Sequence, residues 1–190
     1  FRTELINKIV GFNSHITVQP YEEAININNV KKGSLELISK NLILSNSSEA
    51  IIIKEKSSKG ILLRGYLEDD FSKLELINNK NFVGETKNLE KNFISIGKEL
   101  SFTLDLKIGD NISIMSSSGV ETIIGNLPKQ KTFTVLSIFD SGLADFDNNI
   151  IFLNLETLEE FSNLSINDRN LKVYLKNPQK IENKKNLIYT

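Results

Sequence analysis

Two segments carry residues whose spacing approaches that of known ligand-binding loops. The first, GNLPKQKT (125–132), ends like a phosphate-binding loop, but Gln130 stands where that motif has its second glycine. The residues after it are typical of a strand, so the helix N-terminus that would hold a phosphate is missing. We therefore expect no nucleotide site and no ATP hydrolysis in this chain.

The second segment resembles a calcium-binding loop. Asp145, Asp147, Asn149 and Glu156 stand at positions 1, 3, 5 and 12 of that pattern. Position 6, which needs glycine for a sharp turn, is Ile150. The pattern therefore indicates a polar turn before a buried strand, and we expect no metal.

No set of residues suggests catalysis. His15 is the only histidine and has no second histidine with which to form a dyad or a metal pair. The serines lack a neighbouring base in a nucleophile motif, and Glu22–Glu23 and Asp69–Asp70 are typical of solvated loop carboxylates. We expect a protein that is not an enzyme and has no cofactor.

Composition narrows the possible partners. The chain has 190 residues, with 23 Lys and Arg against 24 Asp and Glu, so no net field attracts nucleic acid. Cysteine is absent, which excludes disulfides and thiol chemistry. No apolar run approaches the roughly 18 residues that a membrane helix needs.

The first half of the chain predicts alternating helices and strands. Residues 1–10 form a helical stripe that ends at Gly11, with no capping residue at its start. We interpret this stripe as the tail of a longer helix that begins upstream, although an ordinary N-terminal helix remains open. The further predictions are a strand at 15–19, a helix at 33–41, a hairpin of 50–55 with 61–68 and a helix at 71–80.

The second half predicts mainly strands. We expect extended segments and turns over 97–110, 111–119, 131–142 and 148–154, a helix at 155–164 capped by Asn154, a strand at 171–176 and a helix start at Asn177–Pro178. The predicted fold class is α+β, with an α/β sandwich formed by both chain ends, 1–81 and 156–190. A β-rich module, residues 82–155, is inserted between them.

One segment has no simple structural role. Residues 116–130 form a long connection that carries the apolar side chains of Val120, Ile123, Ile124 and Leu127. Long loops within compact domains are usually functional or disordered. The segment is either a protruding β-hairpin arm suited to binding a partner or a hairpin folded onto its own core.

Residues 97–116 and 125–161 resemble a known family, the transmembrane subunits of the lipoprotein-releasing system of the LolC and LolE type. The resemblance extends to residues 1–19, and its most specific part is a G-x-x-P-x-Q-[KR] segment followed by IFDSG (138–142). It implies a periplasmic domain of a bacterial inner-membrane protein, with a porter-like part interrupted by a β-rich sabre-like part. In this family a separate cytoplasmic subunit is the ATPase.

The resemblance also implies a site. A hook at about 116–130 would enter a periplasmic lipoprotein carrier chaperone, and a small polar pad would lie at its base. The implied hook residues are Val120, Ile123, Ile124, Gly125, Asn126, Leu127 and Pro128, and the implied pad residues are Lys129, Gln130 and Lys131. The chain departs from the family where Ile123 replaces a proline, where Lys131 replaces an arginine, and near Ile112–Ser113, which lacks a basic residue.

The implied function is to release lipoproteins from the inner membrane and pass them to the carrier. The implied partners are the carrier, the lipoprotein substrate, a second transmembrane subunit that is identical or homologous, and the ATPase through the full-length protein. Two alternatives remain open. One is the periplasmic domain of a MacB-type efflux or mechanotransmission permease, a class without this arm, and the other is a soluble ligand-binding or hydrolytic α/β domain.

Overall fold

The chain divides into two units, a smaller one from both ends of the sequence and a larger one from its middle. The computed structural model describes residues 13–31, 34–55, 57–78, 80–87, 89–123 and 125–178. Unit 1 consists of Phe1–Ser45 and Ile166–Thr190, and unit 2 of Asn46–Ser165. The chain therefore crosses between the units twice, after Ser45 and after Ser165.

Unit 1 is built on a small antiparallel sheet with β9 at its centre. Its described strands are β1 (Ile16–Val18), β9 (Asn170–Leu175) and the first part of β2 (Ser39–Lys54). The unit also contains α2 (Ile27–Lys31), α3 (Ser34–Ile38) and the 3-10 helix η1 (Ile166–Asp168). Leu171, Val173 and Leu175 are buried on β9, as its alternating pattern predicts, but Tyr174 is buried as well.

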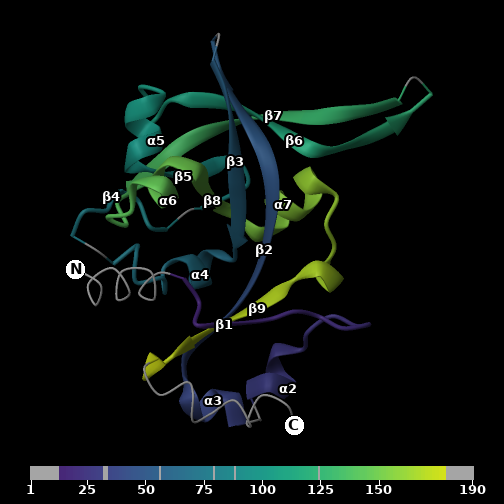
Figure 1. Ribbon diagram of the computed structural model, residues 1–190, viewed down its shortest axis with the longest axis vertical. Coiled ribbons are helices and arrows are strands. Elements are labelled where there is room, and N and C mark those ends of the chain that lie inside the picture. The colour runs from purple at the N-terminus through teal and green to yellow at the C-terminus, as the bar shows by residue number, and fades with distance from the viewer. Residues whose placement is uncertain are drawn as a thin grey trace. The chain divides into compact units, whose positions relative to one another are not determined.

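Unit 2 is a β-barrel, because its hydrogen-bonded strands form a closed ring (Figure 1). The order around the ring is β2, β3, β8, β5, β7, β6 and back to β2. The bounds are β3 (Ser57–Tyr66), β5 (Phe93–Gly97), β6 (Asn111–Thr122), β7 (Gly125–Phe139) and β8 (Ile150–Asn154). The pairs β3–β8 and β5–β7 are parallel, and β5–β8, β6–β7 and β2–β6 are antiparallel. Closure pairs the edges that an open sheet would expose.

Every strand of the ring contributes to one apolar core. Alternate side chains point inward along each strand. The inward residues of the strands are Ala50, Ile52, Ile61, Leu63, Ile94, Ile96, Ile112, Ile114, Phe133, Val135, Ile151 and Leu153. Leu100, Leu158 and Phe161 from two helices join the same cluster.

Helix α7 (Leu155–Ser162) covers part of this core. It begins as the sequence predicts, because the side chain of Asn154 accepts a hydrogen bond from the amide of Thr157 at 3.1 Å. It ends at Asn163, which has left-handed backbone angles. The helix lies close to β3 at Gly65, where a Cβ would stand 2.9 Å from the Cα of Leu155.

The remaining described elements are α4 (Glu68–Phe71), β4 (Val83–Gly84), α5 (Lys98–Thr103) and α6 (Ala144–Asn149).

Three local predictions are wrong. Residues 144–149, where a polar turn is predicted, form α6. Residues 98–103, predicted as extended, form α5, and its residue Leu100 is buried together with Leu104, which follows one helical turn later. The helix predicted at 71–80 is replaced by turns after α4, which ends at Phe71. Leu74 and Leu76 are both buried, and a regular helix would place these two side chains on opposite faces.

The unit boundaries also differ from the predicted domain boundaries at 81/82 and 155/156. The hairpin of β2 and β3 belongs to the same barrel as β8, because β3 pairs with β8 from Leu62↔Ile150 to Tyr66↔Asn154. The division into a porter-like and a sabre-like part stays a prediction.

The helix predicted at 1–10 and most of the helix that starts at Asn177–Pro178 lie outside the described residues. Within the described part of the chain, no helix combines the length and apolarity needed to cross a bilayer.

Gly97 provides a test of the barrel packing, because a Cβ at this position would collide with the backbone carbonyl of Asp147 in α6. We expect Gly97→Ala to lower the free energy of unfolding by about 3 kcal/mol or more, as for severe overpacking. The measurement is chemical denaturation followed by circular dichroism. Gly60→Ala is the matched control, because no atom lies within 4 Å of the added Cβ, and its effect should stay within about 0.5 kcal/mol. Equal effects of the two variants would contradict the packing described.

Candidate functional site

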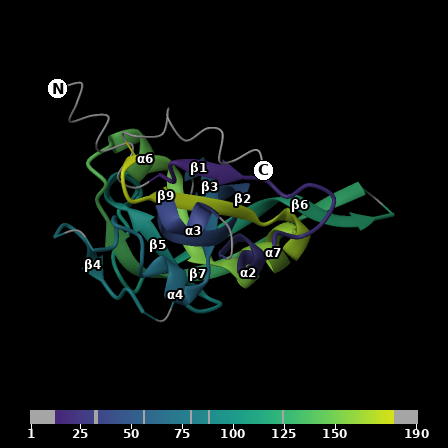
Figure 2. The same ribbon diagram turned by 90° about the horizontal axis from the view of Figure 1, so that it is seen from below.

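The most distinctive surface feature of unit 2 is the outer part of the β6–β7 hairpin. These strands pair along the barrel from Asn111↔Thr134 to Met115↔Gln130, and then again from Gly119↔Pro128 to Thr122↔Gly125. We call the second stretch, residues 119–128, the arm. Both views show the arm extending beyond α7, away from the barrel (Figure 1 and Figure 2).

The tip of the arm exposes apolar side chains. Ile123 in the turn is fully exposed, and Leu127 on β7 is 51% exposed. Gly125 follows the turn with a φ of +117°, a conformation that favours glycine. The side chains of Val120, Ile124 and Asn126, also predicted hook residues, lie outside the described part of the structure. The described residues thus form a hairpin whose apolar side chains at the tip face solvent.

A bulge bends β6 where the arm leaves the barrel. From Met115 to Gly119 the strand advances four residues, while β7 advances two, from Gln130 to Pro128, so β6 carries two extra residues. Such bulges bend a strand and increase its twist. The hydroxyl of Ser117, within the bulge, donates to the carbonyl of Glu49 on β2 at 2.8 Å.

The C-terminal turn of α7 holds both strands of the arm at its base. The ammonium of Lys129 donates to the carbonyl of Glu160 at 2.8 Å and to Oδ1 of Asn163 at 2.5 Å. A cation is favourable at this end of a helix, where carbonyl groups lack intrahelical partners. Nδ2 of Asn163 donates to the carbonyl of Gly119 on the other strand at 3.0 Å.

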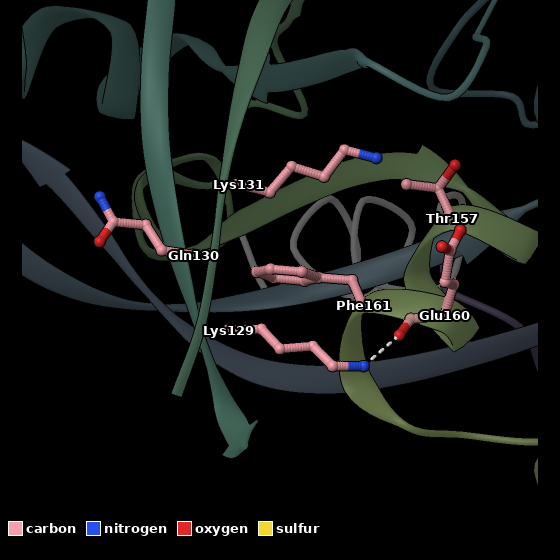
Figure 3. Close-up of a pocket in the computed structure, with 6 residues that line it drawn as sticks. All are labelled: Lys129, Gln130, Lys131, Thr157, Glu160 and Phe161. Atoms are coloured by element: carbon pink, nitrogen blue, oxygen red, sulfur yellow. Dashed lines mark hydrogen bonds between the residues drawn. The ribbon is translucent and has the colours of Figure 1, made fainter. Parts of the chain in front are cut away.

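A cleft of about 320 Å³ lies between β7 and α7, beside the base of the arm (Figure 3). Its lining residues are Lys129, Gln130, Lys131, Thr157, Glu160 and Phe161. Figure 3 shows the side chains of Lys129 and Lys131 on the α7 side of the strand and that of Gln130 on the opposite side. Strand alternation therefore divides the predicted pad between two faces.

The pad side chains also have partners within the domain. Gln130 donates to the hydroxyl of Ser113 at 2.7 Å across the hairpin. Lys131 donates to the carbonyl of Lys91 at 3.2 Å, and its ammonium lies 5.3 Å from the centre of the Phe133 ring. The pad is thus a polar surface that is already ordered by internal hydrogen bonds.

The IFDSG segment forms the turn that leads from β7 into α6. The amide of Gly142 donates to Asp140 at 2.9 Å, and Lys98 donates to the same carboxylate at 2.9 Å. The amide and hydroxyl of Ser141 donate to the buried carboxylate of Asp147, the hydroxyl at 2.6 Å. The motif therefore serves as a structural turn.

The two carboxyl groups of this turn have opposite pKa shifts. The hydrogen bond from Lys98 lowers the pKa of Asp140 below its usual 3.8. Burial raises the pKa of Asp147 above that value, although the hydrogen bonds from Ser141 act in the opposite direction. Asp140 thus stabilises the fold above the pKa of the unfolded chain, and this contribution is lost as the pH falls through its folded pKa. The contribution of Asp147 is present below its unfolded pKa and is lost as the pH rises through the folded pKa.

His15, the only histidine of the sequence, has a structural contact in unit 1. His15 in unit 1 accepts a hydrogen bond from the amide of Leu175 through Nδ1 at 2.8 Å. In the part of the chain that the structure describes, no three metal-ligating side chains of His, Cys, Asp or Glu gather at one point. Sequence reasoning missed Glu49, Glu160 and Asn163, because two of them contribute only backbone carbonyls to the arm. The Asn after a predicted helix end indicates a cap but says nothing of the arm.

Comparison with curated proteins gives one consistent result. The chain is 28% identical over 115 residues to the lipoprotein-releasing system transmembrane protein LolC of Xylella fastidiosa, a match that covers 60% of this chain and 28% of that protein. It is 23% identical over 135 residues to LolC of Neisseria meningitidis serogroup B, covering 70% of this chain and 32% of that protein. The matches span about a third or less of these relatives. Over the residues that these matches cover, the chain is similar to LolC.

Comparison with solved structures shows a similar fold in two domains of membrane transporters. The periplasmic region of MacB from Actinobacillus actinomycetemcomitans matches with a TM-score of 0.55 at 12% identity, covering 95% of this chain and 85% of that one. The extracellular domain of the ABC-type transporter YknZ from Gram-positive bacteria matches at 0.53 and 14% identity, with 88% of each chain covered. No family model matches the chain. The predicted resemblance and the location in the periplasm, as part of an inner-membrane protein, are confirmed.

The turn at residues 138–142 can be tested by carboxyl NMR titration. We expect Asp140 to titrate below 3.8 and Asp147 above it. Lys98→Met should raise the pKa of Asp140, because it removes the largest cause of the shift. Ser141→Ala should raise the pKa of Asp147 further, because it removes a hydroxyl that favours the charged form. Identical titration of the two groups in the unmodified domain would contradict the geometry of the turn.

Proposed function

We propose that this domain belongs to an ABC transporter subunit that releases lipoproteins from the inner membrane and hands them to a periplasmic carrier chaperone docked on the arm. The names of the LolC relatives support the lipoprotein as substrate. The solvent-facing apolar tip of the arm, Ile123 and Leu127, is the observation that carries the docking proposal.

The chemistry of the tip suits insertion into an apolar cavity of the carrier. Burying a fully exposed Leu or Ile side chain contributes about 1.5–3 kcal/mol, and because Leu127 is only 51% exposed, Ile123 and Leu127 together supply roughly 2–4.5 kcal/mol. Part of this energy offsets the loss of freedom on binding. An interface that relies on so few apolar groups binds reversibly, and a carrier that must leave with its lipoprotein needs that property.

The base of the arm supplies a polar rim for the same partner. Gln130 and Lys131 flank the strand on opposite faces and are held by Ser113 and by the carbonyl of Lys91. Polar rims of this kind set the orientation of a partner more than its affinity.

The rest of the transport cycle lies with other parts of the assembly. In our proposal a cytoplasmic ATPase subunit hydrolyses ATP, and a second transmembrane subunit, identical or homologous, pairs with the one that bears this domain. Nucleotide-driven movement would then reach this domain through the segments at its two ends, and the lipoprotein would pass to the carrier held on the arm.

The docking proposal is tested by charge substitution on the arm. We expect Leu127→Asp and Ile123→Asp each to weaken binding of the domain to the lipoprotein carrier of the same bacterium by about tenfold or more. The reason is the loss of roughly 1–3 kcal/mol of apolar burial together with the cost of desolvating a carboxylate. Binding is measured by surface plasmon resonance, and circular dichroism verifies the fold.

Phe102→Asp is the matched control. Phe102 lies on α5, away from the arm, and is 70% exposed. Its replacement by Asp introduces the same charge as the arm variants, so the affinity for the carrier should be unchanged. Unchanged affinity in the two arm variants would refute the docking assignment. Binding of a periplasmic efflux adaptor in place of the carrier would favour the MacB-type alternative.

A further inference from the structure

We propose that Lys129 and Asn163 are positioning residues that fix the arm to the C-terminal turn of α7, so that the tip is already oriented when a partner arrives. This inference rests on the proposed docking function of the arm. It assigns Lys129 an internal role, where the family resemblance implies a partner contact.

A single side chain bridges the two strands of the arm. Oδ1 of Asn163 accepts from Lys129 on β7, and Nδ2 of the same amide donates to the carbonyl of Gly119 on β6. The amide can do both because its oxygen accepts while its nitrogen donates. Asn163 thus holds both strands at the point where the hairpin leaves the barrel.

The strand pairing of the hairpin changes next to this point. Gly119 lies opposite Pro128, and because proline has no N–H, this is a pair whose backbone groups point away from the partner strand. The outward carbonyl of Gly119 accepts from Asn163. The bulge at 116–118 interrupts the strand pairing immediately before this pair. The contacts with α7 therefore replace cross-strand support where it is missing.

The backbone at Asn163 suits this role. Its φ of 55° and ψ of 35° are left-handed values, which Asn adopts more readily than most residues other than glycine. This conformation ends α7 and is the one in which the amide reaches both strands. Lys129, in turn, places its charge on the carbonyl of Glu160 in the last turn of the helix.

Fixing the arm affects binding through the fraction of molecules that are ready to bind. A two-stranded ribbon without neighbours is marginally stable in water. If the docked orientation falls to about one molecule in ten, the apparent Kd rises about tenfold with no change in the contacting side chains. The positioning residues should therefore alter carrier affinity without touching the carrier.

The absence of cysteine from the chain allows a direct measurement of arm orientation. Spin labels on Ile123→Cys at the tip and Phe102→Cys on α5 report the spread of distances between the arm and the barrel by pulsed electron resonance; both native side chains are exposed. We expect one narrow distribution in the parent domain. Asn163→Gly, which keeps the left-handed backbone but removes the amide, and Lys129→Met should each broaden it. Lys129→Arg, which retains a cationic donor, should restore a narrow distribution.

Carrier affinity completes the test. The double variant Lys129→Met with Asn163→Gly should bind the carrier about tenfold more weakly, while its thermal unfolding stays close to that of the parent. Unbroadened distances in both single variants would overturn the proposal, as would broadened distances with unchanged affinity.

Leu127→Asp should lose binding yet keep a narrow distribution. If the parent domain fails to bind the carrier although the variants broaden the distances, the docking function fails and the positioning of the arm stands.

Discussion

The structure of unit 2 depends on the closure of its β-barrel and on the helix that covers it. In the closed ring each strand pairs with a neighbour on both sides. The part of β6 and β7 that continues past the ring has no further strand beside it. Any support for the arm must come from outside the sheet. It comes from the C-terminal turn of α7, through Lys129, Glu160 and Asn163.

Helix α7 also holds the two places where the chain enters and leaves unit 2. The side chain of Asn46, buried at the entry, donates to Oε1 of Glu159 at 2.8 Å and to the carbonyl of Ser165, at the exit, at 3.4 Å. Leu158 and Phe161 on the same helix are part of the barrel core. One helix of eight residues, with the turn that ends it, therefore contacts the barrel core, the residue Asn46 at which the chain enters unit 2, and the base of the arm. Its position is fixed by the close approach to Gly65, which leaves no room for a side chain.

Much of this fold could be predicted from the sequence where the signal is local. Alternating apolar residues indicate β6 and β7, a continuous apolar run indicates β8, and Asn154 before an amphipathic stretch marks the start of α7. Closure of the barrel could not be predicted, because it depends on pairings such as Ala50↔Ser116 between residues far apart in the chain. The pattern of residues 116–130 leaves open whether the hairpin protrudes or folds onto its own core. The contacts of Lys129 could not be predicted, since they involve the helix end that follows β8.

The contacts at the base of the arm also bear on the risk of aggregation that any protruding hairpin carries. An exposed apolar ribbon invites pairing with another chain through its free edges, and such edges are a route to aggregation. Pro128 removes one backbone donor from the arm, and Asn163 occupies the carbonyl of Gly119. The exposed apolar surface in the described part of the tip is confined to Ile123 and Leu127, which is small by the standard of surfaces that associate without specificity. Side-chain insertion into a partner cavity therefore remains available to the arm, while strand addition is disfavoured at its base.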